Sequence, residues 1–396
     1  MTIAYRAATV ITDVLADTAV HDAVVLIEAD RIAWVGPADR APISAHVETV
    51  DLGDRVLLPG LMDAHVHLAF DASGDPVESM LARDEPARLE SMRRSARQLV
   101  ESGVTFARDL GSPRGLSARI RDEIRDGTTP GPRLMVAGRP LTRPSGHCWF
   151  MGNEVDGPGR ARDAVREELD AGADLIKVMV TGGRMTAGTD PLRFEIPETT
   201  LAAIVDEAHH HGVTVAAHAL STAGVRAAVT ARVDTIEHGT FISPQGGDGF
   251  DTALVRELAD AGIAVCPTLG VVGAHAHPIP LEIRGGWIAG LHAAGVPILA
   301  GTDSGIPRHP HVGGVVDGLK GLLAAGLSTR QALAAATEAG MRAAGLPMAG
   351  AVKPGYLADV IAVDEDPRSD VEALLEPPVV IAAGRIVKDT TGEAGA

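Results

Sequence analysis

Cysteine and long apolar runs are nearly absent from this chain of 396 residues. Only Cys148 and Cys266 are present, so no disulfide framework is indicated and a reducing cytoplasm is the expected compartment. No run of about 18 apolar residues occurs, so we expect no transmembrane helix. The N-terminus lacks a basic segment followed by an apolar core, so we expect no signal peptide either.

Positive charge is also scarce. Lys and Arg total 35 against 52 Asp and Glu, a formal net charge of -17 at pH 7. This balance argues against nucleic acid or an anionic membrane as a partner, since either needs a basic surface. The only lysines are Lys177, Lys320, Lys353 and Lys388. Lys177 stands out because it lies inside the apolar run DLIKVMVTGG, where an ammonium is costly unless something pairs with it.

Two β-rich ends flank a middle that alternates strands and helices. Residues 1–56 and 346–396 show period-two alternation with Asp and Gly punctuation, which predicts one small sheet domain built from both termini. In residues 57–345, eight apolar strand segments alternate with amphipathic segments, several of which end in a glycine that suits a helix C-cap. This pattern predicts an α/β fold with a (β/α)8 barrel. An open doubly wound sheet is disfavoured because no Gly-rich phosphate loop follows the first strand.

Polar side chains that can bind metals fall at the ends of the predicted barrel strands, where such barrels carry their functional residues. His65 and His67 are spaced i, i+2 in DAHVH, so both imidazoles lie on one face of a strand and can reach one ion. The others, on the fourth, fifth, sixth and eighth strands, are Lys177, His218, His238 and Asp303. A lone histidine there is more often a packed core residue, but the joint placement predicts a metal site.

The motifs LLPGLMDAHVHL, IKVMVTGG, VAAHA, DTIEHGT and LAGTDSG, in this order, resemble the metal-dependent amidohydrolase superfamily. The tail STRQALAAATEAG…VKPGYLADVIAVDEDP is similar to the stretch in which that family leaves its barrel. The resemblance spans essentially the whole chain and is closest to the imidazolonepropionase-like and prolidase-like branch with a carboxylated lysine. It implies a distorted (β/α)8 barrel with a small β-sandwich domain formed by both termini. It also implies hydrolysis of dipeptides, N-acyl amino acids, lactams or other small amides.

The resemblance further implies two divalent metal ions, first of all zinc, with manganese, cobalt or iron as alternatives. The implied ligands are His65, His67 and Asp303 for one ion, His218 and His238 for the other, and Lys177 bridging both as a carbamate formed with CO2. A carbamate requires a neutral amine, which burial of a lysine promotes and which arginine cannot supply. The alternative for Lys177 is a buried ion pair with Asp174 or Asp109.

These expectations predict a mechanism without a serine or cysteine nucleophile. Two neighbouring divalent ions lower the pKa of a shared water, so that hydroxide is available at neutral pH to attack the amide carbonyl. Asp303 would accept the proton and deliver it to the leaving nitrogen. Cys148 is interpreted as a small packed residue.

Substrate selection is expected from the loops that follow the strands. His147, in the segment SGH, is the candidate to hydrogen-bond the substrate. Arg184, His275 and His277 are further candidates, although each is explained equally well as a solvated loop residue. In dipeptide-cleaving relatives a Tyr or His stands two residues after the fifth-strand histidine and helps to hold a carboxylate. Leu220 stands there in this chain, which favours a less polar or cyclic amide.

The sequence also allows other functions. A mononuclear deaminase or imidazolonepropionase-like hydrolase of a cyclic amidine or amide would not need Lys177. Such enzymes usually place a glutamate shortly after the fifth-strand histidine, and HALSTAG has none. A non-catalytic scaffold with the same fold is a second alternative, and phosphotriester hydrolysis is a possible side activity. We expect a small-molecule amide as the substrate and a homo-oligomer as the assembly.

Overall fold

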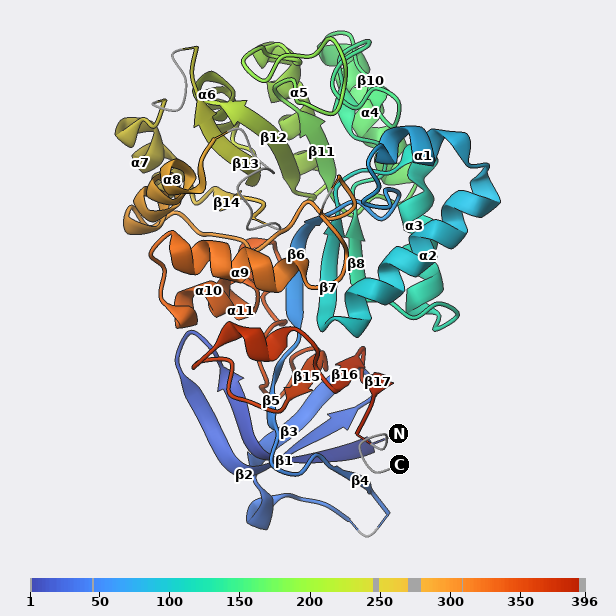
Figure 1. The fold of residues 1–396 in the computed structure, drawn as a ribbon. Coiled ribbons are helices and arrows are strands. Elements are labelled where there is room, and N and C mark those ends of the chain that lie inside the picture. The colour runs from blue at the N-terminus through green and yellow to red at the C-terminus, as the bar shows by residue number, and fades with distance from the viewer. Residues whose placement is uncertain (1, 45, 245–248, 270–278, 308, 392–396) are drawn as a thin grey trace.

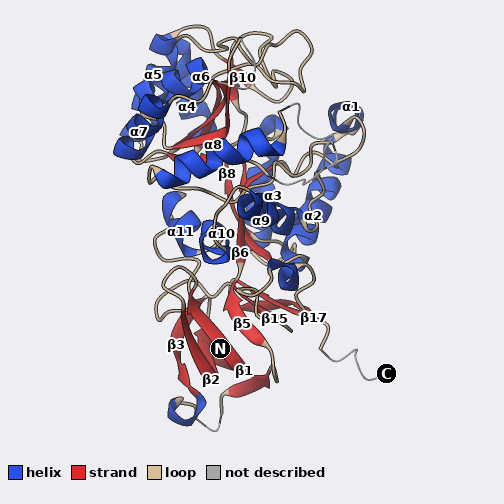
Figure 2. Ribbon diagram, turned by 60° about the vertical axis from the view of Figure 1, so that its left-hand side comes forward, coloured by secondary structure: helices blue, strands red, loops and turns tan. Residues whose placement is uncertain are grey.

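The structure is a computed structural model that describes residues 2–44, 46–244, 249–269, 279–307 and 309–391. A barrel of strands and helices occupies its upper part and a sheet made from both ends of the chain lies below it (Figure 1). In Figure 2 the helices gather around the barrel strands. Within the described ranges, no helix is long and apolar enough to span a membrane.

The lower unit is one eight-stranded sheet with strand order β17-β16-β15-β5-β1-β2-β3 and with β4 beside β1. The strands are β1 (Thr2–Asp13), β2 (Thr18–Glu28), β3 (Arg31–Pro37), β4 (Glu48–Asp51), β5 (Val56–Pro59), β15 (Val360–Val363), β16 (Val379–Ala382) and β17 (Arg385–Asp389). Strand β5 joins the two ends of the chain, because it pairs with β1 in parallel and with β15 in antiparallel orientation. Val25 of β2 and Ile381 of β16 share one apolar cluster although their strands are not neighbours, so the sheet curls around its core.

The barrel strands run parallel to one another. They are β6 (Leu61–Val66), β7 (Val104–Asp109), β8 (Arg133–Val136), β11 (Ile176–Met179), β12 (Val215–Ser221), β13 (Thr235–Ile242) and β14 (Ala264–Cys266). The short strands β9 (Leu141–Thr142) and β10 (Asn153–Glu154) continue the sheet beyond β11. A backbone hydrogen bond of 2.8 Å from Asp174 N to Val136 O connects β8 to the residues leading into β11.

Residues 297–304 close the barrel, in the place of the predicted eighth strand. They form isolated bridges rather than a continuous strand, one from Ile298 to Val265 of β14 and one from Ser304 to Val66 of β6. Asp303 donates its backbone N–H to His65 O at 2.8 Å, so the segment still runs alongside β6. The distorted (β/α)8 barrel with a small β domain formed by both termini is therefore the observed fold.

The helices cover the outside of the barrel (Figure 1). They are α1 (Pro76–Ala82), α2 (Glu85–Glu101), α3 (Leu116–Arg125), α4 (Pro158–Asp170), α5 (Glu198–His210), α6 (Thr222–Ala231), α7 (Thr252–Ala261), α8 (Leu281–Ala293), α9 (Gly314–Ala324), α10 (Thr329–Ala335) and α11 (Glu338–Ala343). Gly103, Gly172 and Gly212 follow α2, α4 and α5 with φ of 89°, 93° and 73°. Only glycine adopts this left-handed conformation without strain, which explains why the glycine signals located the helix ends correctly.

Lys353 links the sheet to the barrel. Its Nζ lies 2.6 Å from Asp13 Oδ2 at the end of β1 and 3.1 Å from Glu338 Oε2 in α11. Burial alone would raise the pKa of Asp13, but hydrogen bonds from Ala16 N and from its charged neighbours outweigh burial and lower it to about 2. Because the folded pKa lies below the ordinary value of 3.8, the stabilisation is present above that value and is lost as the pH falls toward 2.

We expect Lys353→Met to reduce the free energy of unfolding at pH 7 by about 1–2 kcal/mol, a modest figure because the lysine side chain is partly exposed. Urea denaturation at pH 7 and at about pH 3 measures the effect, which should be smaller at the lower pH because Asp13 is protonated in the unfolded chain there. Lys320→Met is the matched control, since Lys320 pairs at 2.6 Å with an exposed Glu372. An equal loss of stability at both pH values would contradict the assignment.

Candidate metal centre

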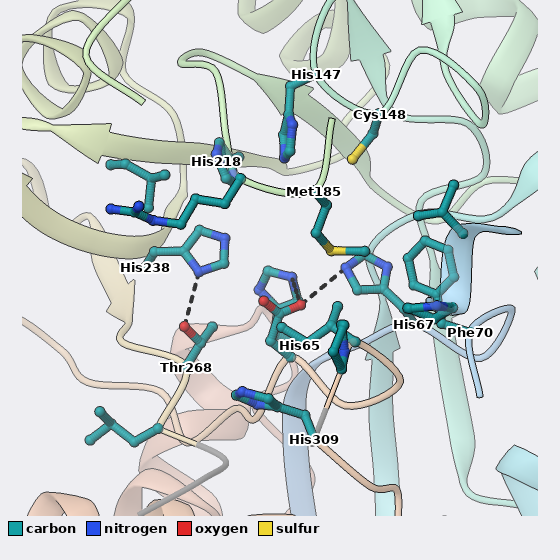
Figure 3. A pocket seen from close by; sticks show the side chains of 18 of the residues that line it. His65, His67, Phe70, His147, Cys148, Met185, His218, His238, Thr268 and His309 are labelled. Atoms are coloured by element: carbon teal, nitrogen blue, oxygen red, sulfur yellow. Dashed lines mark hydrogen bonds and ion pairs between the residues drawn. The ribbon is translucent and has the colours of Figure 1, made fainter. Parts of the chain in front are cut away.

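The six predicted ligand side chains line one cavity of about 930 Å³ at the carboxyl ends of the barrel strands. Figure 3 shows the four histidines among them. The six side chains come from β6 and the residue that follows it, from β11, β12 and β13, and from the segment 297–304. They are His65, His67, Lys177, His218, His238 and Asp303. The fold therefore brings together residues that are up to about 240 positions apart in the sequence.

Asp303 faces His65 of β6 and His67, which directly follows that strand. Its Oδ1 lies 3.4 Å from His65 Nε2 and 3.2 Å from His67 Nε2. Burial alone would raise the pKa of Asp303, but the surrounding histidines outweigh burial and hold it well below its usual range. Asp303 is therefore an ionised carboxylate, the form that binds a cation or accepts a proton.

His218 and His238 form the neighbouring pair. Their ring centroids are 4.6 Å apart, and the His238 ring lies 5.1 Å from that of His65. Burial lowers the pKa of both imidazoles well below the ordinary value, so both are neutral. His238 Nδ1 is hydrogen-bonded to Thr268 Oγ1 at 2.9 Å (Figure 3), and His218 Nε2 lies 3.1 Å from Gly182 O. These bonds leave His238 Nε2 and His218 Nδ1 as the ring nitrogens that could bind a cation.

Two of the six residues have an unusual backbone, with φ of 70° at His238 and 60° at Asp303. In a regular strand Glu237 and His238 would point to opposite faces. Here both approach His65, and Glu237 Oε2 lies 2.8 Å from His65 Nδ1. The left-handed turn at His238 directs its ring into the cavity. Each such residue costs on the order of 1–3 kcal/mol, so the fold sustains strain at two positions of the site.

A buried ion pair lies behind His65. Arg108 donates from Nη2 to Glu237 Oε1 at 2.8 Å and from Nε to Ala64 O at 2.7 Å. Burial alone would raise the pKa of Glu237, but Arg108 and His65 outweigh it and lower the pKa below its ordinary value. The resulting carboxylate holds the proton of His65 on Nδ1, which directs His65 Nε2 toward Asp303. Neither Arg108 nor Glu237 was predicted as part of the site.

Asp63 holds the segment 297–304 against β6. Its carboxylate accepts hydrogen bonds from Thr302 N at 3.0 Å and from Thr302 Oγ1 at 2.6 Å. Burial raises the pKa of Asp63 to about 7. Thr302 has a further contact, because its backbone O lies 2.9 Å from His309 Nδ1. Asp303 is thus positioned by its neighbour in the chain rather than by a regular strand.

Lys177 is 1% exposed in β11, and burial lowers its pKa even though Glu237 and Asp303 oppose the shift. Among the described residues, no carboxylate lies within the 4.0 Å of its Nζ that an ion pair requires. Asp174 pairs instead with Arg121 at 2.8 Å, and Asp109 accepts the backbone N–H of Leu68 at 2.9 Å. The ion pair considered for Lys177 is therefore not formed with either acid.

His147 belongs to the same cavity. Its ring centroid lies 4.8 Å from that of His218, and burial followed by the charge of Lys177 lowers its pKa to about 4. His147 Nδ1 is buried and has no hydrogen-bond partner among the described residues. A Cβ on Gly183 would collide with the His147 ring, so a glycine at this position in the loop after β11 leaves room for that ring.

The remaining predicted substrate contacts differ in their placement. Arg184 and Leu220 line the cavity, Arg184 as an exposed residue and Leu220 as a buried one. His275 and His277 lie outside the described residues. Cys148 also lines the cavity and is buried, and burial raises the pKa of its thiol to about 12, which agrees with its interpretation as a packed residue.

A model of the amidohydrolase family matches residues 56–389. The chain belongs to the amidohydrolase family. It is therefore a hydrolase that acts on carbon–nitrogen bonds, and the resemblance identified in the sequence is confirmed.

Three known proteins are examples of those to which this amidohydrolase is similar. Ochratoxinase from Aspergillus niger is 27% identical over 406 aligned residues, which cover 91% of this chain and 81% of the relative. Imidazolonepropionase from Arthrobacter sp. (strain FB24) is 35% identical over 108 residues, 27% of this chain and 25% of the relative. The crystal structure of a putative prolidase from Bifidobacterium longum is 32% identical with a TM-score of 0.82, covering 97% of this chain and 94% of the other. They place the amidohydrolase in the imidazolonepropionase-like and prolidase-like branch.

The donor set of this amidohydrolase fits divalent metal ions, which its family generally binds. His65, His238 and Asp303 each offer a ligand atom, and these atoms lie within 4.8 Å of one another. Neutral imidazole and ionised carboxylate are suitable ligands for zinc and related metals. A second group of His65, Glu237 and Cys266 has the same spacing. That group fits poorly, because Glu237 is paired with Arg108 and burial raises the pKa of Cys266 well above its ordinary value.

Thr268 provides a test of how the His238 ring is held in the amidohydrolase. Thr268→Val removes the hydroxyl that bonds His238 Nδ1 at 2.9 Å, and we expect metal affinity to fall by about 10- to 100-fold. Competition with a chelator measures the change. Thr105→Val is the matched control, because the buried Thr105 hydroxyl has no hydrogen-bond partner among the described residues. Unchanged affinity in Thr268→Val would show that this bond does not orient the ligand.

Proposed function

We propose that this amidohydrolase is a binuclear metal-dependent enzyme that cleaves an amide C–N bond of a small molecule. The observation that carries the proposal is Lys177, a fully buried lysine among the candidate ligands with no acid paired to it in the described residues. Burial lowers the pKa of the histidines around it, and its charge adds to that shift; they are His65, His147, His218 and His238. A carbamate on Lys177 would replace this unpaired ammonium with an anion that two cations neutralise.

The proposed metal ligands are those that face one another in the cavity. His65, His67 and Asp303 would hold one ion, His218 and His238 the other, and Lys177 would contact both. Zinc is the first expectation for this mixture of imidazole and carboxylate. When bound, the two ions would activate a water molecule for attack and polarise the substrate carbonyl.

Side chains of the protein would transfer the proton and contact the substrate. Asp303, ionised and facing the cavity, would accept the proton released by the attacking water and pass it to the leaving nitrogen. His147 Nδ1 would find in the substrate the hydrogen-bond partner that the described residues do not supply. The apolar side chains of the lining would exclude water and contact an apolar substituent; these are Phe70, Met185, Leu220, Leu269 and Ile306.

The test combines metal analysis with a substrate screen. We expect two metal ions per chain by elemental analysis, release of amine from members of a panel of N-acyl amino acids, dipeptides and lactams, and loss of this activity after chelation. One ion per chain, with activity retained in Lys177→Ala, would instead support the mononuclear deaminase or imidazolonepropionase-like alternative. Metal-loaded protein that releases no product from any amide, lactam or ester would support the non-catalytic scaffold.

A further inference from the structure

Arg284, in the second turn of α8, is a buried cation on the cavity wall. It lines the cavity and is only 8% exposed. Burial is the single cause of its lowered pKa, about 10, so no charged group of the described residues acts on it. Arg184, the arginine considered from the sequence, is exposed and lies in the loop after β11 rather than on α8.

The guanidinium of Arg284 has far fewer partners than it can bind. It offers five N–H donors, and its one hydrogen bond within the described residues runs from Nη2 to Pro267 O at 2.7 Å. Arg108, the other buried arginine among the described residues, has Glu237 at 2.8 Å and also donates to Ala64 O. A buried guanidinium without an anion is costly, so an anion is the missing partner of Arg284.

The position of Arg284 relative to the metal centre suits a substrate group. Pro267, which accepts its hydrogen bond, directly precedes Thr268, and Thr268 contacts His238. Glu282 also lines the cavity, but it is exposed and forms no ion pair with Arg284. Leu220, on β12, contributes apolar surface to the same cavity.

We propose that Arg284 binds a carboxylate of the substrate and thereby selects amides that carry an acidic group. The inference rests on the proposed function, because it concerns the same cavity. It also revises the expectation drawn from Leu220, since the carboxylate is recognised from α8 rather than from the position two residues after His218. Arginine and carboxylate form paired, charge-assisted hydrogen bonds, which gives the site preference for an acid over a neutral analogue.

The experiment compares two substrates that differ only in the carboxylate, N-benzoyl-L-phenylalanine and N-benzoyl-2-phenylethylamine, within a wider panel of N-acyl amino acids and their decarboxylated amines. Wild type should prefer the acids. Arg284→Met should lower kcat/KM for the acids by about 10- to 100-fold and change kcat/KM for the neutral amides by less than about threefold. Arg284→Lys should recover part of the preference. Arg256→Met, an exposed arginine in α7, is the matched control.

Binding separates failure of this inference from failure of the proposed function. Calorimetric titration of each acid into metal-loaded protein should give a Kd that is about 10- to 100-fold weaker in Arg284→Met. If no substrate is hydrolysed but this difference in Kd is found, the proposed function fails and the Arg284 assignment stands. Equal losses for acid and neutral members, as expected if Arg284 only positions Pro267 and Thr268, overturn the assignment. Wild-type protein that binds no acid also overturns it.

Discussion

If the proposed function holds, Lys177→Met is expected to lower kcat/KM for amide hydrolysis by at least about 1,000-fold, because the variant cannot form the anion that would contact both metal ions. Methionine is unbranched and close in length to lysine, so it fills the same buried position in β11 without a charge. We therefore expect the fold to persist, the metal content to fall below two ions per chain and the remaining activity to be independent of bicarbonate.

Metal-free wild type, in contrast, should need bicarbonate as well as metal to recover its activity. Lys388→Met is the control, since Lys388 lies at the surface and donates to Glu101 O at 3.1 Å. It should keep wild-type activity and metal content. Two ions per chain and full activity in Lys177→Met would rule out the bridging carbamate. One ion per chain with full activity would support the mononuclear alternative.

Asp303→Asn is expected to reduce kcat by about 100- to 10,000-fold, the contribution typical of a positioned acid–base group. Asparagine keeps the shape of the side chain and tolerates left-handed backbone, so it suits the φ of 60° at this position. The loss should therefore come from the missing charge and proton acceptor rather than from unfolding. Steady-state kinetics on metal-saturated enzyme, with thermal denaturation alongside, measures both.

Asp206→Asn is the control for Asp303→Asn. Asp206 lies on the surface of α5, where it pairs with Arg162 at 3.4 Å, and its replacement should leave kcat unchanged. A decrease of less than tenfold in Asp303→Asn, with the metal site fully occupied, would mean that another group carries the proton. His147 would then be the next candidate, because it is neutral and lines the same cavity.

The fold could be predicted from the sequence wherever the signal is local. Alternation in VTFARDLG and apolar periodicity in RARDAVREELDAG depend on neighbouring residues, and both segments form the expected strand and helix, β7 and α4. The segment PILAGTDSG is apolar enough to predict a strand. The segment instead forms isolated bridges and is hydrogen-bonded to Asp63 through Thr302. These two residues meet only in the folded chain, so no local sequence pattern predicts their contact.

The same distinction applies to the site. The i, i+2 spacing of His65 and His67 has a direct geometric meaning on a strand. Glu237 was missed because alternation places it on the face opposite His238, and the left-handed turn that brings both toward His65 is not visible in the sequence. Arg108 carried the same signal as Lys177, a charge within an apolar strand, and that signal could have been used.

Arginine burial was the hardest property to predict. Arg184 follows Gly182 and Gly183 in the loop after β11, which made it a candidate, and it is exposed, as the alternative of a solvated loop residue expects. Arg284 stands in the helix LEIRGGWIAGLHA, where an arginine usually faces solvent. Its burial results from the packing of α8 beside α7 and α9 with its first residues at the cavity, which is a tertiary property.

The pairing of β5 with β15 has a consequence for synthesis of the protein on the ribosome. Strand β5 ends at Pro59 and its partner begins at Val360, so about 300 residues must be translated between them. At a translation rate of about 5–20 residues per second, one edge of β5 stays unpaired for on the order of 15–60 s. The N-terminal strands β1 to β3 can form a meander early, but the lower sheet is completed only when the last residues emerge. Newly made chains that stop before residue 360 should therefore expose a β edge and be prone to aggregation or to capture by chaperones.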